Sequence, residues 1–175
     1  ILCESSTYEL VKVTPEAALP LVTNLFRFDE LQGKVAQAGD GAHDLPYEDS
    51  AALGAVLAEP YRRLVERVRL LYRRDDFTGP LGLGQLDPHG LPFQRLRLAR
   101  TPGLVTQVYG PLVTGAMLAE AGYVHSLGDL NWWKPDGQMF YSPDELDTPT
   151  QELVYASQHF FRPCRYTDPF TNTTH

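Results

Sequence analysis

The sequence predicts an α+β fold in which a helical middle is flanked by antiparallel β-strands. Three features of the 175 residues support this prediction. Apolar side chains follow a helical spacing from Tyr61 to Tyr72, apolar and polar residues alternate loosely near the start, and aromatic and turn-forming residues crowd the end. We therefore expect a mixed strand and helical segment at 1–122 and an aromatic-rich β-hairpin segment at 123–175.

The beginning of the chain predicts one strand and two short helices. Residues 1–13 alternate between apolar and polar side chains, which is typical of a half-buried strand. Residues 14–16 (Thr-Pro-Glu) resemble a helix start, although Pro20 would end this helix early. A second helix is expected from Phe28, and residues 38–44 have the composition of a loop.

The strongest predicted element is a helix that begins at Pro60 and ends near Asp75. Its apolar side chains fall at i, i+3, i+4, i+7, i+10 and i+11, which makes one stripe at helical period. Residues 79–90, rich in glycine and proline, predict a connector, and residues 91–98 alternate as a strand does. The stripe consists of Tyr61, Leu64, Val65, Val68, Leu71 and Tyr72.

Two more short helices are expected before Gly122. Thr101 has the side chain of an N-cap, with a proline following it, and residues 110–111 (Gly-Pro) should interrupt the helix. Thr114 is expected to cap the last helix.

The aromatic-rich stretch predicts strands and tight turns. Residues 132–141 predict a β-hairpin, because Pro135 fixes φ for a turn and Gly137 accepts a positive φ. Residues 150–161 fit either a helix or a strand. The residues that follow are expected to be extended, with another turn at Asp168.

Composition argues against several classes of function. The formal net charge of −7 disfavours a surface for nucleic acid or anionic membrane. No run of about 18 apolar residues is present, so we expect no transmembrane helix. The five histidines are dispersed, which disfavours a metal site, and no cofactor is expected. Cys3 and Cys164 are expected to be free thiols, although a bridge between them stays open.

Two groups of side chains are candidate binding surfaces. Arginines oppose the apolar stripe of the predicted helix, and such a face either binds acidic partners or, more often, is solvated and paired with acids of the same chain. Adjacent tryptophans beside an aspartate and an asparagine suit a sugar, although neighbouring strand residues point to opposite faces. The basic face consists of Arg62, Arg63, Arg67, Arg69, Arg73 and Arg74, and the aromatic surface consists of Asp129, Asn131, Trp132 and Trp133.

No set of residues has the pattern of an active site. A G-x-S-x-G motif is missing, and neither cysteine has a histidine partner that the sequence alone identifies. Acid pairs such as Asp75-Asp76 lie beside turn residues and are expected to be solvated. The G-x-G of residues 82–84 lacks the rest of a phosphate-binding loop. We therefore expect a protein that is not an enzyme, with no catalytic, cofactor or metal residues.

Several uncommon strings of this sequence occur in the same order in one protein family. From about residue 60 onward the chain resembles the B component of the bacterial Tc insecticidal toxin complexes, which is related to the Salmonella virulence-plasmid 65 kDa B-type and RHS-repeat proteins. The strings include residues 70–76 (Leu-Leu-Tyr-Arg-Arg-Asp-Asp), 131–133 (Asn-Trp-Trp), 140–143 (Phe-Tyr-Ser-Pro), 159–161 (His-Phe-Phe) and 168–170 (Asp-Pro-Phe).

The resemblance implies a structural role in a secreted toxin complex that is made in the bacterial cytoplasm. In that family the corresponding region lies after a β-propeller, in the part that builds a hollow shell of RHS-repeat strands. The implied function is to form shell wall around the toxic C-terminal part of the C component, for delivery through the pore of the A component. RHS-like β-hairpins are then expected in the C-terminal part, with no nucleic acid and no membrane contact by this segment.

The alternative is a non-catalytic module that binds a glycan or a protein through the aromatic hairpin. The chain starts without methionine and ends on turn residues, so we also expect it to belong to a longer polypeptide.

Overall fold

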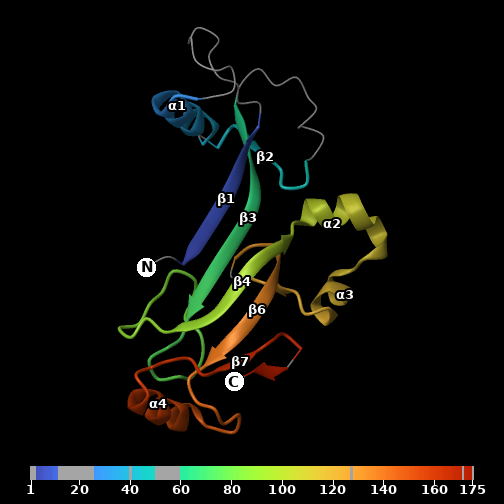
Figure 1. Cartoon of the computed structure of the whole chain (residues 1–175). Coiled ribbons are helices and arrows are strands. Elements are labelled where there is room, and N and C mark those ends of the chain that lie inside the picture. Colours follow the sequence, from blue (N-terminus) through green and yellow to red (C-terminus); the bar gives the residue numbers. More distant parts are fainter. Residues whose placement is uncertain are drawn as a thin grey trace. The chain divides into compact units, whose positions relative to one another are not determined.

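The computed structural model describes residues 3–11, 26–39, 41–49, 60–126, 128–170 and 172–174 (Figure 1). Within these ranges the fold is mixed α+β and consists mostly of one sheet, as the α+β prediction requires. The helix predicted from residues 14–16 lies outside the described residues. Contacts divide the chain into two compact units, residues 6–66 and residues 1–5 with 67–175.

The described residues of the unit 6–66 include one helix and parts of two long strands. Strand β1 (Glu4–Val11) and helix α1 (Phe28–Ala38) confirm the predicted strand and the helix predicted from Phe28. The short strand β2 (Asp44–Leu45) pairs in parallel with the beginning of β3 (Tyr61–Tyr72).

The second unit contains the rest of the sheet. The strand order is β1-β3-β4-β6-β7-β8, with β5 paired to β6, and the pairs from β3 to β8 are antiparallel. The compact units do not divide at residue 122, since β4 pairs with β6 across that position. The strands are β4 (Pro92–Arg100), β5 (Val124–His125), β6 (Trp132–Phe140), β7 (Arg165–Thr167) and β8 (Thr173–Thr174).

Short helices lie at both ends of the β4–β6 pair in this second unit (Figure 1). Helix α2 (Pro102–Tyr109), the 3-10 helix η2 (Gly110–Leu112) and α3 (Gly115–Glu120) follow β4, whereas α4 (Pro149–Gln158) follows β6. As predicted, Thr101 caps α2 and Thr114 caps α3. The Gly-Pro pair of residues 110–111 ends α2 and lies in η2. The stretch that fitted either helix or strand is the helix α4.

The helix predicted between Pro60 and Asp75 is wrong, because these residues form β3. Their spacing of apolar side chains suits a helix, but the Leu70 amide donates to the Cys3 carbonyl at 2.9 Å and the strand pairs with β4 on its other side. Non-local strand pairing therefore outweighs the local period.

The β-hairpin predicted at 132–141 is also wrong, because the single strand β6 runs through these residues. In the register with β4, Pro135 and Gly137 pair with two adjacent residues, so Asp136 is extra and makes a β-bulge. Gly137 has a φ of 144°, and a Cβ there would lie 3.3 Å from the backbone oxygen of Thr167. Pro135 and Gly137, which predict a turn, instead flank a β-bulge.

A buried cluster packs α4 against the end of the sheet. Its members are Phe77, Leu91, Tyr141 and Ala156, and the rings of Phe77 and Tyr141 meet edge to face with centroids 5.6 Å apart. The Tyr141 hydroxyl donates to the Pro92 carbonyl at 2.8 Å. Burial raises the pKa of this hydroxyl above its ordinary range, so it stays a hydrogen-bond donor.

Candidate functional site

The predicted aromatic surface lies at the start of β6 but does not form a platform. Trp133 is fully buried, whereas the half-buried Trp132 packs on the His125 imidazole with centroids 3.9 Å apart and planes tilted by 39°. Adjacent side chains of a strand point to opposite faces, so the two indoles cannot contact one sugar together. The glycan-binding alternative thereby loses the pair of rings on which it depended.

Asp129 and Trp133 belong instead to a polar cluster with Arg69 of β3. One carboxylate oxygen of Asp129 accepts hydrogen bonds from the Trp133 indole at 3.0 Å and from the Asn131 amide at 2.9 Å. The other oxygen lies 2.9 Å from Arg69 Nη1, and the Arg69 guanidinium lies 4.1 Å from the Trp133 ring centroid. Arg69 Nε also donates to Glu4 at 2.6 Å. The two predicted surfaces therefore share one cluster, whose polar groups bind one another.

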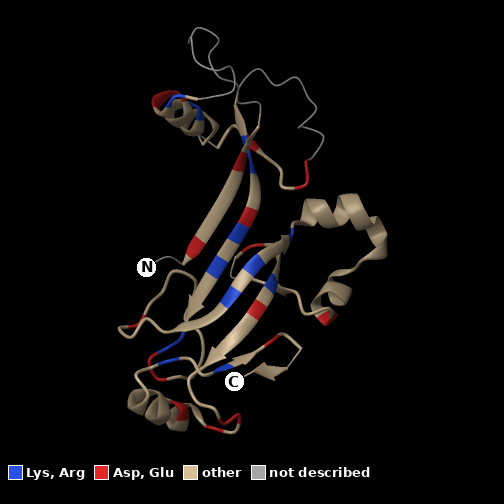
Figure 2. Cartoon of the chain, in the orientation of Figure 1, with Lys and Arg blue, Asp and Glu red and all other residues tan. Residues whose placement is uncertain are grey.

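The predicted basic face is not a helix face, because its arginines lie along β3 and the turn after it. On β4 all charged residues are positive, and Arg95 and Arg97 lie 3.4 and 3.5 Å from Asp136 of the neighbouring β6 (Figure 2). Ion pairs neutralise the charge that a phosphate would need, and the exposed ones contribute little stability. The pairs of the predicted basic face are Arg62–Asp44, Arg63–Glu9 at 2.6 Å, Arg67–Glu4 at 3.9 Å, Arg69–Glu4 at 2.6 Å and Arg73–Glu152 at 2.8 Å, and Arg74 lies exposed in the turn near Asp76.

The pair of Arg73 and Glu152 is the deepest of these ion pairs. Their side chains are 2% and 7% exposed, and Arg73 Nη1 lies 2.8 Å from Glu152 Oε2. The other carboxylate oxygen accepts the Tyr141 amide at 2.7 Å, and Arg73 Nη2 donates to the Met139 carbonyl at 2.9 Å. Burial lowers the pKa of Arg73, and the carboxylate of Glu152 opposes this shift. The pair ties β3, β6 and α4 together and is a structural centre.

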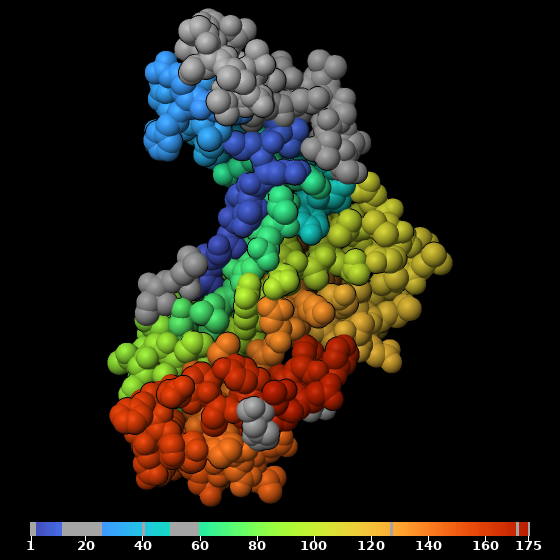
Figure 3. Space-filling view, viewed as in Figure 1, coloured from blue at the N-terminus to red at the C-terminus, as the bar shows by residue number. Residues whose placement is uncertain are grey.

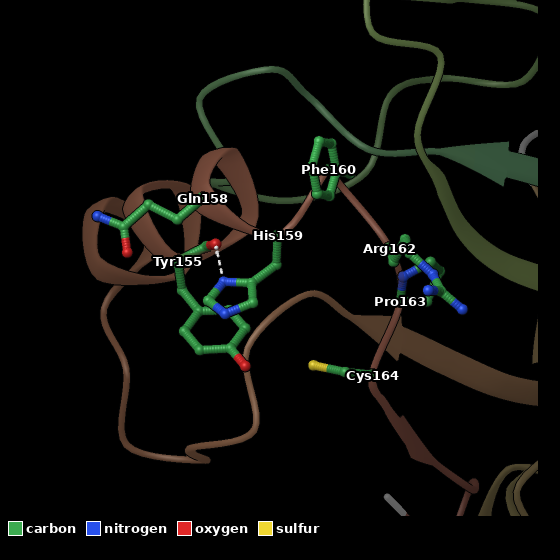
Figure 4. Close-up of a pocket in the computed structure, with 7 residues that line it drawn as sticks. All are labelled: Tyr155, Gln158, His159, Phe160, Arg162, Pro163 and Cys164. Carbon is green, nitrogen blue, oxygen red and sulfur yellow. Dashed lines mark hydrogen bonds between the residues drawn. The ribbon is translucent and has the colours of Figure 1, made fainter.

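An open pocket of about 340 Å³ lies beside the C-terminal end of α4 (Figure 4). The rings of Tyr155 and His159 stack with centroids 3.8 Å apart and planes 10° apart. His159 Nδ1 donates to the Tyr155 carbonyl at 2.8 Å, and the Cys164 thiol points toward this ring pair from the opposite wall. The remaining lining residues are Gln158, Phe160, Arg162 and Pro163.

The pocket contains groups that can bind a ligand but no activated nucleophile. Burial raises the pKa of the Cys164 thiol, which lowers the fraction of reactive thiolate at neutral pH. The Nδ1 atom of His159 donates to a backbone carbonyl, and among the described residues no hydrogen bond joins the Cys164 thiol to the other imidazole nitrogen. Aromatic faces and one guanidinium group are therefore the chemistry that this pocket offers.

In the described ranges, no three histidine, cysteine, aspartate or glutamate side chains gather as metal ligands. The helices of the described chain also fall short of the length and apolar character that crossing a membrane requires.

Sequence reasoning missed both Glu152 and the pocket. Nothing near Glu152 in the sequence marks this acid as buried beside an arginine 79 residues away. Phe160 and Phe161 have φ values of 58° and 51°, which L-residues seldom adopt and sequence does not predict. One available signal was the capping box of Thr148 and Gln151, which fixes the start of α4 and so the turn that carries the stacked rings.

Comparisons of the chain with models of known protein families and with curated proteins give no match.

Proposed function

We propose that the chain is a structural wall segment of a toxin-complex B component, within an RHS-type shell that encloses the toxic C-terminal part of the C component. In this proposal the segment is not an enzyme. Its partners are the C component as cargo and the A component as pore, in a secreted complex. The order of the strings from about residue 60 to residue 175 is the basis of this proposal.

The observation that carries the proposal is the long antiparallel sheet. Strands β3, β4 and β6 have 12, 9 and 9 residues, and their side chains alternate between two faces, as a wall requires. Several charged groups on these strands pair with acids, as Arg69 of β3 pairs with Asp129 at 2.9 Å. The two short strands β7 and β8 extend the sheet by a hairpin, which is compatible with RHS-like hairpins.

A helical lobe made of α2, η2 and α3 supports membership of a larger assembly. Residues 101–119 contain no charged side chain, and the lobe appears almost uncharged in Figure 2 and lies on the surface in Figure 3. Val108, Leu112 and Met117 are 59%, 79% and 51% exposed. Exposed apolar surface of this kind commonly marks a contact region, so we infer that the lobe is covered in the full complex.

Protection of the cargo tests the proposal. The full-length natural subunit would be produced with its co-encoded C component and treated with protease. We expect the C-terminal part of the C component to survive in the complex and to be digested when it is made alone. Leu112→Glu, which adds a charge to the lobe, should lower this protection, whereas Leu112→Met should not. Equal digestion of the cargo with and without the subunit would count against the shell.

A further inference from the structure

We propose that the pocket beside α4 binds a small ligand that combines a planar aromatic ring with an anionic group. This inference does not depend on the shell proposal. It depends on the backbone at Phe160, on the stacked rings of Tyr155 and His159, and on the charge of Arg162.

The chain leaves α4 through a Schellman motif that has an unusual residue at its left-handed position. The Phe161 amide donates to the Ala156 carbonyl at 2.9 Å, and the Phe161 side chain packs on the buried cluster that contains Ala156. The left-handed position of the motif, directly before Phe161, is occupied by Phe160, which has a φ of 58°. Glycine is usual at this position, because a Cβ crowds the backbone there. Phe160 therefore carries a strain that glycine would not.

Packing of the side chain offsets the strain of the left-handed backbone at Phe161 but not at Phe160. Phe161 is partly buried, and its ring centroid lies 4.6 Å from that of His89. Phe160 is 88% exposed, so burial of its ring does not offset the strain of its backbone. Strained residues whose side chains add no packing are candidates for function. The ring of Phe160 lies beside the pocket (Figure 4).

The stacked pair gives the pocket a flat aromatic surface. Tyr155 lies in the last turn of α4 and His159 directly follows the helix, with the two ring planes only 10° apart. The hydrogen bond from His159 Nδ1 to the Tyr155 carbonyl fixes the imidazole in this orientation (Figure 4). Planar rings pack favourably in offset or edge-to-face geometry on such a surface. The stacked rings therefore favour a ligand with a planar aromatic ring.

Arg162 specifies the charge of the ligand. Its side chain extends away from the stacked rings in Figure 4, so the anionic group would lie at the far rim of the pocket. Arg162 is exposed, and in the described part of the chain no carboxylate pairs with its guanidinium, unlike the arginines of β3. A free guanidinium favours a carboxylate or sulfonate partner. The C-terminal end of α4 would oppose an anion, but the carbonyls of Ala156 and His159 already accept the amides of Phe161 and Arg162.

The remaining walls suit the same ligand. Cys164 and Pro163 contribute apolar surface, because burial keeps the thiol protonated by raising its pKa. A volume of about 340 Å³ lies at the lower end of the range of small-molecule pockets, which is about 300–1,000 Å³. One or two fused rings with an acidic substituent match this volume.

A fluorescent aromatic anion, 8-anilinonaphthalene-1-sulfonate, can test this inference in solution. Titrated into the natural chain, it should show saturable binding at one site. Arg162→Gln should weaken this binding about tenfold, since charge-assisted hydrogen bonds are roughly twice as strong as neutral ones. The uncharged analogue N-phenyl-1-naphthylamine should be affected less than about twofold. Arg74→Gln, which removes another exposed arginine, is the matched control and should leave both probes unchanged.

Phe160→Gly separates function from structure. It should raise the melting temperature, because glycine relieves the left-handed strain, and yet weaken probe binding about fivefold through the lost ring contact. Leu112→Ser controls for binding of the probe to the uncharged lobe and should have no effect. Unchanged binding in Phe160→Gly and Arg162→Gln, or loss of binding in Leu112→Ser, would overturn the proposal. A lower melting temperature in Phe160→Gly would assign this ring a structural role instead.

Discussion

Replacing Glu152 by glutamine perturbs an ion pair whose two side chains are both buried. The substitution keeps an oxygen that can accept the Tyr141 amide, now 2.7 Å from Oε1, but it removes the charge that faces Arg73 at 2.8 Å. Arg73 is 2% exposed, so its guanidinium would remain buried without a counter-charge. Breaking a buried ion pair from one side costs about 3–5 kcal/mol, and we expect a loss of free energy of unfolding in this range. Glu152→Ala should cost about 1 kcal/mol more, because the Tyr141 amide also loses its acceptor.

Urea unfolding, followed by tryptophan fluorescence, measures this loss, because both tryptophans lie in the same compact unit as the pair. Glu145→Gln is the matched control: this glutamate is exposed, and its substitution should change stability by less than about 0.5 kcal/mol. The double variant Arg73→Met with Glu152→Leu should be more stable than Glu152→Gln, since it leaves no unpaired charge. A cost below about 1 kcal/mol for Glu152→Gln, or a double variant worse than the single one, would refute the reasoning.

Two further predictions concern a bulge and a turn. Gly137→Ala should destabilise the fold by more than about 1 kcal/mol in the same unfolding assay, because of the φ of 144° and the Thr167 oxygen 3.3 Å from the added Cβ. Gly33→Ala in α1, where a Cβ meets nothing within 4 Å, should instead stabilise by about 0.5–1 kcal/mol, and the opposite order would contradict the described backbone. The side-chain and backbone amides of Asn172 donate to Asp168 and lower its pKa. Because the folded-state pKa lies below the ordinary value of about 3.9, the turn keeps its full stabilisation above that pH and loses it as pH falls through the lowered pKa. The Asn172 amide resonance should titrate with a midpoint below about 3.9 and lose this transition in Asp168→Asn; a midpoint at or above that value would contradict the hydrogen bonds.

Local signals were sufficient for the elements that local contacts decide. The caps at Thr101 and Thr114 satisfy amides three residues away, and the helix from Phe28 is likewise a local element. The alternation of residues 91–98 predicts β4, although its paired residues in β3 and β6 lie 20 or more residues away. The region of β3 is different. Arg69 meets Glu4 across 65 residues, and such partners cannot be seen in a window of helical length. The apolar spacing of β3 therefore predicts a helix where the chain forms a strand.

The candidate site was predicted only in part for a similar reason. Asp129 and Trp133 were chosen for their chemistry and do lie together, but Arg69 joins them and buries the indole. The pocket beside α4 depends on the left-handed backbone at Phe160 and Phe161. The same residues in an ordinary helix end would point elsewhere, so composition alone could not reveal the pocket.

The central claim is that this sheet forms part of the wall of a hollow shell. Electron cryomicroscopy of the full-length natural subunit, purified with its co-encoded C component, tests it most directly. We predict a hollow particle with β3, β4 and β6 in its wall, the uncharged lobe of α2, η2 and α3 covered by protein, and density for the cargo inside. A solid particle, or a hollow one in which this sheet stands outside the wall with its lobe exposed, would contradict the account.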